Sequence, residues 1–124
     1  MTSLLLEVLY EGATLTLYGV VIADACEASE WLAGCDKKTK AQFAARFERL
    51  TTVGYLRGPE EMRQLQCSVD PPVSEIKTQS GHRLYVVRHS KDWVATHGAK
   101  KPSDRKVCDQ AKKAIKIWEE AHKQ

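Results

Sequence analysis

The segment VSEIKTQSGHRLYVVRHSKDWVATH, residues 73–97, decides the fold of this chain. Apolar and polar residues alternate along residues 73–78, 83–89 and 93–97, and the short polar stretches QSG and SKD separate these runs. Alternation with a period of two is typical of β-strands, and short connections suit antiparallel neighbours. The segment therefore predicts a three-stranded antiparallel meander.

Two helical patterns precede the meander, over residues 24–34 and 36–54. The first opens with an Asp-x-x-Glu start signal and closes at a glycine. The second opens at Asp36, a good capping residue, carries apolar residues at helical spacing and closes at Gly54. These patterns predict a helical hairpin.

Three further segments complete the chain. Residues 4–22 hold two apolar runs around Glu11-Gly12, which predict a β-hairpin or one longer strand. Residues 60–66 follow a proline and begin with two acids, which favours one or two helical turns. Residues 102–118 show one apolar face at helical spacing, so a C-terminal amphipathic helix is expected.

Length and composition indicate one folded domain spanning residues 1–124. The chain has 43% hydrophobic and 28% charged residues, as in ordinary globular proteins, and its length suits a single core. The predicted fold class is α+β: a small antiparallel sheet packed against an N-terminal helical hairpin, with a C-terminal helix.

Cysteine usage and hydropathy bear on the compartment. The four cysteines are widely spaced and form no Cys-x-x-Cys pair, so we expect free buried thiols. The N-terminus lacks the basic region of a signal peptide, and no apolar stretch approaches a membrane span. A cytoplasmic protein without a membrane role is expected. The cysteines are Cys26, Cys35, Cys67 and Cys108.

Positive charge is concentrated in the second part of the chain. Residues 73–124 hold 12 Lys or Arg and 6 Asp or Glu, whereas residues 1–72 hold 7 and 10. Lys77 and Arg83, with Lys100 or Lys101, could build a cationic floor for a phosphate backbone. The alternative is that these are solvated sheet residues whose aliphatic stems cover the core.

Histidines in the meander could supply acid or base chemistry. His82, His89 and His97 lie in or beside the predicted strands, and imidazole titrates near neutral pH. The alternative is that they are structural or surface residues. Their spacing presents no metal-binding set, and no nucleotide-binding loop is present, so neither a metal nor a small-molecule cofactor is expected.

The order of elements and three short motifs resemble the RelE/ParE superfamily of toxins from type II toxin-antitoxin modules, in particular its HigB-like, phage-derived branch. EIK at residues 75–77 corresponds to a Glu-Leu-Arg strand of that branch, and GHR at 81–83 to a Gly-aromatic-Arg turn. ATHGAKK at residues 95–101 corresponds to an aliphatic-His-Gly-Phe-x-Lys-Lys segment that leads into the last helix. The resemblance covers the chain from Asp24 onward.

This resemblance implies a RelE-like fold and a cytoplasmic toxin that cleaves mRNA on the ribosome without a metal and is inhibited by a cognate antitoxin. Lys77 and Arg83 would stabilise the phosphate, and His82 or His97 would act as base or acid. RNA would be held by the remaining candidates, namely Arg88, His89, Lys100 and Lys101.

One departure from the family keeps a second function open. Many active members carry a tyrosine near the start of the last helix, where this chain has Val107 and Cys108. A non-catalytic protein of the same fold, such as a DNA gyrase inhibitor or a phage-derived interaction protein, is therefore the alternative.

Overall fold

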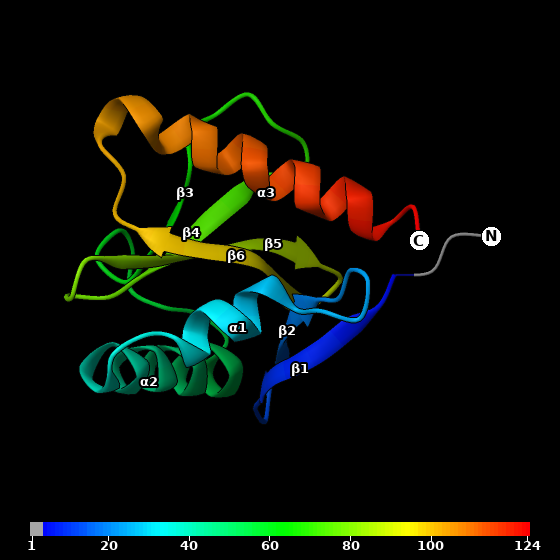
Figure 1. Ribbon diagram of the computed structural model, residues 1–124. Helices are drawn as coiled ribbons and strands as arrows, with labels where there is room; N and C mark the ends of the chain where they lie inside the picture. The colour runs from blue at the N-terminus through cyan, green and yellow to red at the C-terminus, as the bar shows by residue number, and fades with distance from the viewer. Residues whose placement is uncertain (1–3) are drawn as a thin grey trace.

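The structure, a computed structural model, describes residues 4–124 and contains a six-stranded sheet with helices on both faces (Figure 1). The strands lie in the order β1-β2-β6-β5-β4-β3. They are β1 (Leu6–Glu11), β2 (Thr16–Val20), β3 (Met62–Gln64), β4 (Val73–Lys77), β5 (His82–His89) and β6 (Asp92–Lys100). The helices are α1 (Glu27–Ala33), α2 (Lys37–Val53) and α3 (Val107–Ala121), and a 3-10 turn, η1 (Asp104–Lys106), precedes α3.

The predicted meander and the α+β class are confirmed. β4, β5 and β6 pair antiparallel in sequence order, with Glu75 opposite Tyr85 and Tyr85 opposite His97. The last strand is longer than its alternation suggested and ends at Lys100. The N-terminal hairpin is also present, since β1 and β2 pair antiparallel.

The sheet is mixed, so the expectation of a purely antiparallel sheet is wrong. β2 pairs parallel with β6, with Tyr18 beside Val94. The helical pair is also not N-terminal, because β1 and β2 precede α1 and α2. Parallel neighbours need a long crossover, and here the intervening chain carries α1, α2 and three strands.

The helical turns expected over residues 60–66 are absent, and β3 occupies this place as an edge strand. Met62 pairs with Ile76 and Arg63 with Glu75, so the segment completes the hydrogen bonds of the outer side of β4. Tertiary pairing therefore overrides a local helix-start signal.

Separate apolar cores lie on the two faces of the sheet. α1 and α2 cover one face, where Phe43, Phe47 and Leu50 pack on Leu84 and neighbouring strand residues. α3 covers the opposite face (Figure 1). Its buried residues are Ala111, Ala114, Ile117, Trp118 and Ala121.

The helix ends of α2 follow the sequence signals. Asp36 Oδ1 accepts a hydrogen bond from Thr39 N at 2.8 Å, as expected of a capping residue. Gly54 ends the helix with φ +103°, a conformation that favours glycine.

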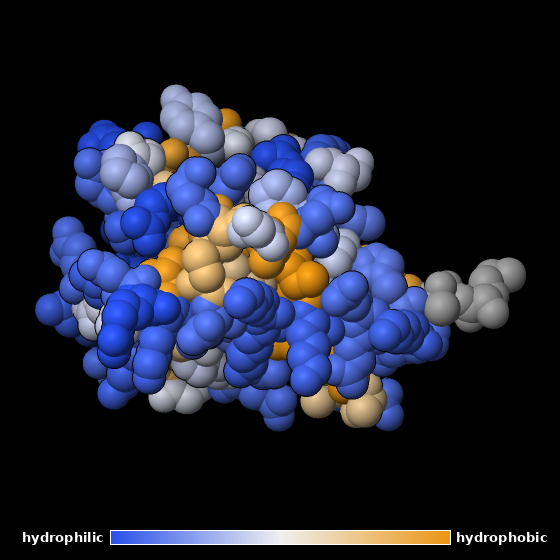
Figure 2. Space-filling model, turned by 90° about the horizontal axis from the view of Figure 1, so that it is seen from above, coloured by the Kyte–Doolittle hydropathy of each residue, from blue (hydrophilic) through white to orange (hydrophobic). Residues whose placement is uncertain are grey.

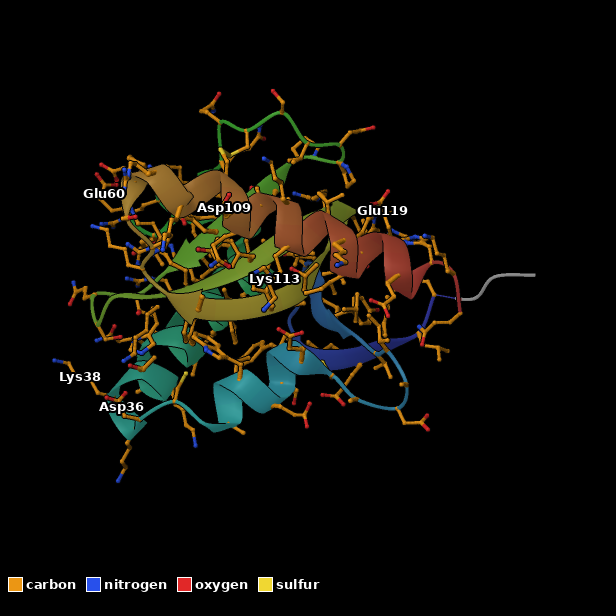
Figure 3. All side chains as sticks on the ribbon, turned by 45° about the horizontal axis from the view of Figure 1, so that its top comes forward. Asp36, Lys38, Glu60, Asp109, Lys113 and Glu119 are labelled. Atoms are coloured by element: carbon orange, nitrogen blue, oxygen red, sulfur yellow. A yellow bond between two sulfur atoms is a disulfide. The ribbon has the colours of Figure 1, made fainter. Side chains whose placement is uncertain are left out.

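The outer side of α3 is polar, as its sequence predicted. Figure 2, seen from the α3 side, shows mainly hydrophilic side chains around a smaller hydrophobic area. Lys112, Lys113 and Lys116 are exposed. Lys113, labelled in Figure 3, forms an ion pair with Glu27 of α1 at 3.1 Å.

The prediction of four free thiols is wrong for two of them. Cys67, in the loop after β3, forms a disulfide with Cys108 in the first turn of α3 (Figure 3). Cys26 is free and buried, and Cys35 is free and partly buried. The bridge joins positions 41 residues apart, which the sequence spacing does not indicate. None of the helices described is long and apolar enough to span a membrane.

Candidate anion-binding site

A row of polar side chains crosses the α3 side of the sheet. Strand register places Arg63 of β3 beside Glu75 of β4, Glu75 beside Tyr85 of β5, and Tyr85 beside His97 of β6. We call these four residues the polar row. The register therefore brings together side chains from four consecutive strands.

A β-bulge places His97 in the polar row. Tyr85 pairs with His97 and Val86 with Ala95, so Thr96 is an extra residue in β6. Strict alternation would put His97 on the same face as Ala95, which packs with the α1 and α2 core. The extra residue reverses this and turns the imidazole toward α3.

Glu75 is the ionic centre of the row. Its side chain is buried, with 1% of the residue exposed. Oε1 accepts a hydrogen bond from Arg63 Nη2 at 2.9 Å, and Oε2 lies 3.8 Å from Arg83 Nε. Arg83 is also buried, and its Nη1 donates to the backbone oxygen of His82 at 3.1 Å. One carboxylate therefore orients two guanidinium groups.

These groups line a hollow of about 120 Å³ between the sheet and the start of α3. We call it the basic hollow. Four basic and two acidic residues contribute to it, so its charge favours an anion. It is lined by Arg63, Glu75, Lys77, Arg83, Lys101, Pro102, Asp104 and Val107.

Lys77 differs from an ordinary surface lysine. Burial, followed by the charge of Arg83, lowers its pKa from the usual value. Its Nζ donates a hydrogen bond to the backbone oxygen of Pro59 at 3.1 Å, which fixes the ammonium at the end of β4. A lysine with a lowered pKa can donate a proton more readily than a solvated one.

His97 lies under α3 rather than in the basic hollow. It is 0% exposed, stacks on Tyr85 with ring centroids 4.8 Å apart, and its Nε2 lies 2.8 Å from Gln110 Oε1. Burial lowers the pKa of His97, which favours the neutral imidazole. Burial, followed by the charge of Glu75, raises the pKa of Tyr85 to about 12, and the Tyr85 hydroxyl has no hydrogen-bond partner among the described residues.

The buried imidazole predicts a loss of stability in acid. His97 in the folded protein takes up its proton at lower pH than in the unfolded chain, whose histidine pKa is about 6.5. Its contribution to the free energy of unfolding is therefore complete above about pH 6.5 and declines below it, by up to about 1.4 kcal/mol per pH unit. Denaturant unfolding at pH 7.5 and pH 5.0 measures this decline.

The matched control is His97→Gln, which keeps a polar side chain but cannot titrate. Carboxylates contribute equally to the acid loss in both proteins, so the difference between them isolates His97. An identical pH dependence in the two proteins would contradict the prediction.

The structure separates the other predicted site residues. His82 and Lys100 lie on the opposite face of the sheet and line a second hollow of about 430 Å³ together with Trp31. His82 Nδ1 lies 3.0 Å from Ser80 Oγ. His82 and the basic hollow are therefore on different sides of β5.

Arg88 and His89 lie at the far end of β5. The Arg88 guanidinium stands 4.9 Å from the Trp93 ring centroid and donates to the backbone oxygen of Lys91 at 2.9 Å. The His89 ring centroid is 5.6 Å from that of Trp118. Of the eight predicted candidates, the basic hollow contains Lys77, Arg83 and Lys101.

Several residues of this region were not predicted as site residues. Arg63 lay in a segment expected to be helical, so its place beside Glu75 could not be anticipated. Glu75 and Tyr85 could have been found from alternation, since they share the face of Lys77 and Arg83. Nothing in the sequence marked Gln110 as a partner of His97.

Comparison with models of known protein families finds no match, and comparison with curated proteins finds none either. The resemblance to RelE/ParE toxins therefore depends on the motifs described above. Within residues 4–124, no group of three or more His, Cys, Asp or Glu side chains is placed to hold a metal ion.

Proposed function

We propose that this protein is the toxin of a type II toxin-antitoxin module with a RelE-like fold, and that it cleaves ribosome-bound mRNA at the basic hollow. The observation that carries the proposal is the convergence of four cationic side chains on one small hollow beside a carboxylate. Guanidinium and ammonium groups fixed in this way suit a phosphodiester, whose charge increases in the transition state.

The proposed reaction is an attack by a ribose 2′-hydroxyl on the adjacent phosphorus. The bond to the 5′-oxygen of the next nucleotide breaks, which leaves a 2′,3′-cyclic phosphate and a 5′-hydroxyl. Arg83 and Lys101 stabilise the non-bridging oxygens of the phosphate, and Lys77 protonates the leaving 5′-oxygen. One of the two carboxylates of the hollow, Glu75 or Asp104, takes the proton of the 2′-hydroxyl. The lowered pKa of Lys77 supports its role as the acid.

The proposed partners are the ribosome, mRNA and a cognate antitoxin, and the proposed compartment is the cytoplasm. The positive charge of residues 73–124 favours a polyanion, and an antitoxin that covers the basic hollow would present acidic residues to it. A small helix-turn-helix reading frame beside this gene would support the pairing.

One observation favours the second candidate, a non-catalytic binder of the same fold such as a DNA gyrase inhibitor or a phage-derived interaction protein. Neither His97, which is 0% exposed, nor His82, on the opposite face, contributes an imidazole to the basic hollow. Val107 and Cys108 also stand where many active relatives of the proposed family have tyrosine.

Expression of the wild type in bacteria should create new mRNA 5′ ends within translated regions. The double variant Lys77→Ala/Arg83→Ala should reduce their frequency by at least about 100-fold, because two groups that stabilise the transition-state charge are removed. Sequencing of mRNA 5′ ends measures the effect.

The control variant is Lys112→Ala/Lys116→Ala, which removes the same formal charge from the exposed side of α3. It should retain the cleavage pattern. An absence of new 5′ ends with the wild type contradicts the nuclease proposal, and a gyrase supercoiling assay then tests the alternative.

A further inference from the structure

The disulfide fastens the one end of α3 that has few other attachments. η1 contains no buried residue, and the N-cap position of α3 is Lys106, which makes no side-chain capping bond. The first buried residue of α3 is Ala111, whereas its second half is held by Ile117, Trp118 and Ala121. The first turn is held by the Cys67–Cys108 bridge, by the partly buried Val107 and by the contact of Gln110 with His97, and only the bridge is covalent.

The fastened turn also covers the polar row and the basic hollow. Pro102, Asp104 and Val107 form one wall of the hollow, and Gln110 holds the imidazole of His97. With this wall in place Arg83 is 6% exposed. The Asp104 carboxylate also stands among the cations, where it competes with an anionic ligand.

The disulfide is accessible from outside. Cys67 and Cys108 line a separate surface hollow of about 290 Å³. Arg63, Asp104 and Val107 line both this hollow and the basic hollow, so the bridge is adjacent to the candidate site. Both cysteines are partly exposed, so a thiol reagent in this hollow comes close to the bridge without unfolding of the core.

We infer that the Cys67–Cys108 disulfide is a redox latch that keeps the basic hollow closed, and that its reduction releases residues 102–110 and exposes Arg83. This inference concerns the regulation of the site and rests on the proposed function only where RNA is the ligand. The reductant is a dithiol protein or a small dithiol.

The exchange balances as two thiol–disulfide steps. A thiolate of the reductant attacks Cys67 Sγ, a mixed disulfide forms, and Cys108 leaves as a thiolate. The second thiolate of the reductant then attacks the mixed disulfide, which releases Cys67 and oxidises the dithiol to its own disulfide. Cys108 is the better leaving group because the N-terminus of the 15-residue helix stabilises a thiolate.

Hydrogen exchange with and without dithiothreitol tests the latch directly. On reduction, the amides whose hydrogen-bond acceptors lie in residues 102–110, namely those of Lys106 and of residues 110–114, should exchange about 30-fold faster (about 2 kcal/mol). Those of residues 115–121 and of β5 should change little. Cys67→Ser/Cys108→Ser should show fast exchange under both conditions. Cys35→Ser, which keeps the bridge, should respond to dithiothreitol as the wild type does.

Binding of a single-stranded RNA oligonucleotide supplies the second measurement. Reduction should tighten binding by the wild type and by Cys35→Ser, but not by the double variant. Faster exchange without RNA binding would support the latch and contradict the proposed ligand. Unchanged exchange at Lys106 and residues 110–114, or an equal loss of protection throughout α3 and the sheet, would overturn the latch itself.

Discussion

Glu75→Ala should lower the free energy of unfolding by about 3–5 kcal/mol. The substitution removes the carboxylate that pairs with Arg63 and Arg83 and leaves the buried Arg83, 6% exposed, without its ionic partner. Arg63 can return to water because its side chain is 46% exposed, whereas Arg83 cannot. Chemical denaturation at pH 7.5 measures the loss.

Two variants separate charge from packing at this position. Glu75→Gln keeps the shape and one acceptor oxygen, so its loss should be smaller than that of Glu75→Ala. Glu75→Leu/Arg83→Met removes both buried charges and should be more stable than Glu75→Ala, because no unpaired guanidinium remains. A double variant as unstable as Glu75→Ala would show that the uncompensated charge is not the cause.

Gly98→Ala should destabilise the protein by about 3 kcal/mol, at the upper end for overpacking of a core. Gly98 lies in β6 on the α1 side, and a Cβ atom there would overlap the ring of Trp31. That ring cannot move aside easily, because it packs edge-on against Phe43 with centroids 5.7 Å apart and lies 5.9 Å from His82. Thermal or denaturant unfolding measures the effect.

A second glycine and a compensating change serve as controls. Gly34→Ala places a Cβ at ordinary contact distance, 3.6 Å from the Trp31 backbone oxygen, and Gly34 has φ −84°, so little loss is expected. In the background Trp31→Leu, the added cost of Gly98→Ala should fall, because a smaller side chain makes room. If Gly98→Ala lowers the free energy of unfolding equally in the wild type and in Trp31→Leu, overlap with the Trp31 ring is not the cause of the loss.

Local patterns predicted the parts of the fold whose partners are close in sequence. The meander was predicted because the runs around Gly81 and around residues 90–92 alternate and connect through short turns. The ends of α2 were predicted because Asp36 and Gly54 act through their own backbone neighbours.

The parts of the fold that could not be predicted depend on contacts between residues far apart in the sequence. The Pro-Glu-Glu signal before Met62 is a valid helix start, but pairing with β4 makes this segment a strand. The second neighbour of β2, after β1, is β6, and nothing near Thr16 indicates pairing with a strand that begins at Asp92. The Cys67–Cys108 bridge depends on the position of α3 over the sheet, which is itself a tertiary feature.

The candidate site shows the same division: local alternation predicted part of it, and irregular or long-range features decided the rest. Strict alternation correctly placed Arg83 and Tyr85 on one face of β5, and the strand register then brought Lys77 beside Arg83. Alternation failed at His97, because one extra residue in β6 changes which face it occupies. The choice between Lys100 and Lys101 was left open, and Lys101 lies in the basic hollow.

The parallel pairing of β2 with β6 has a consequence for the chain during its synthesis. Thr16 N donates to Asp92 Oδ1 across 76 positions, so the inner edge of β2 has no neighbour until the second part of the chain has left the ribosomal tunnel. Until then the N-terminal hairpin presents unpaired backbone to proteases and to other nascent chains. Emergence of β6 from the tunnel, rather than the formation of the first helices, is therefore the event that gives the open edge of β2 its neighbour.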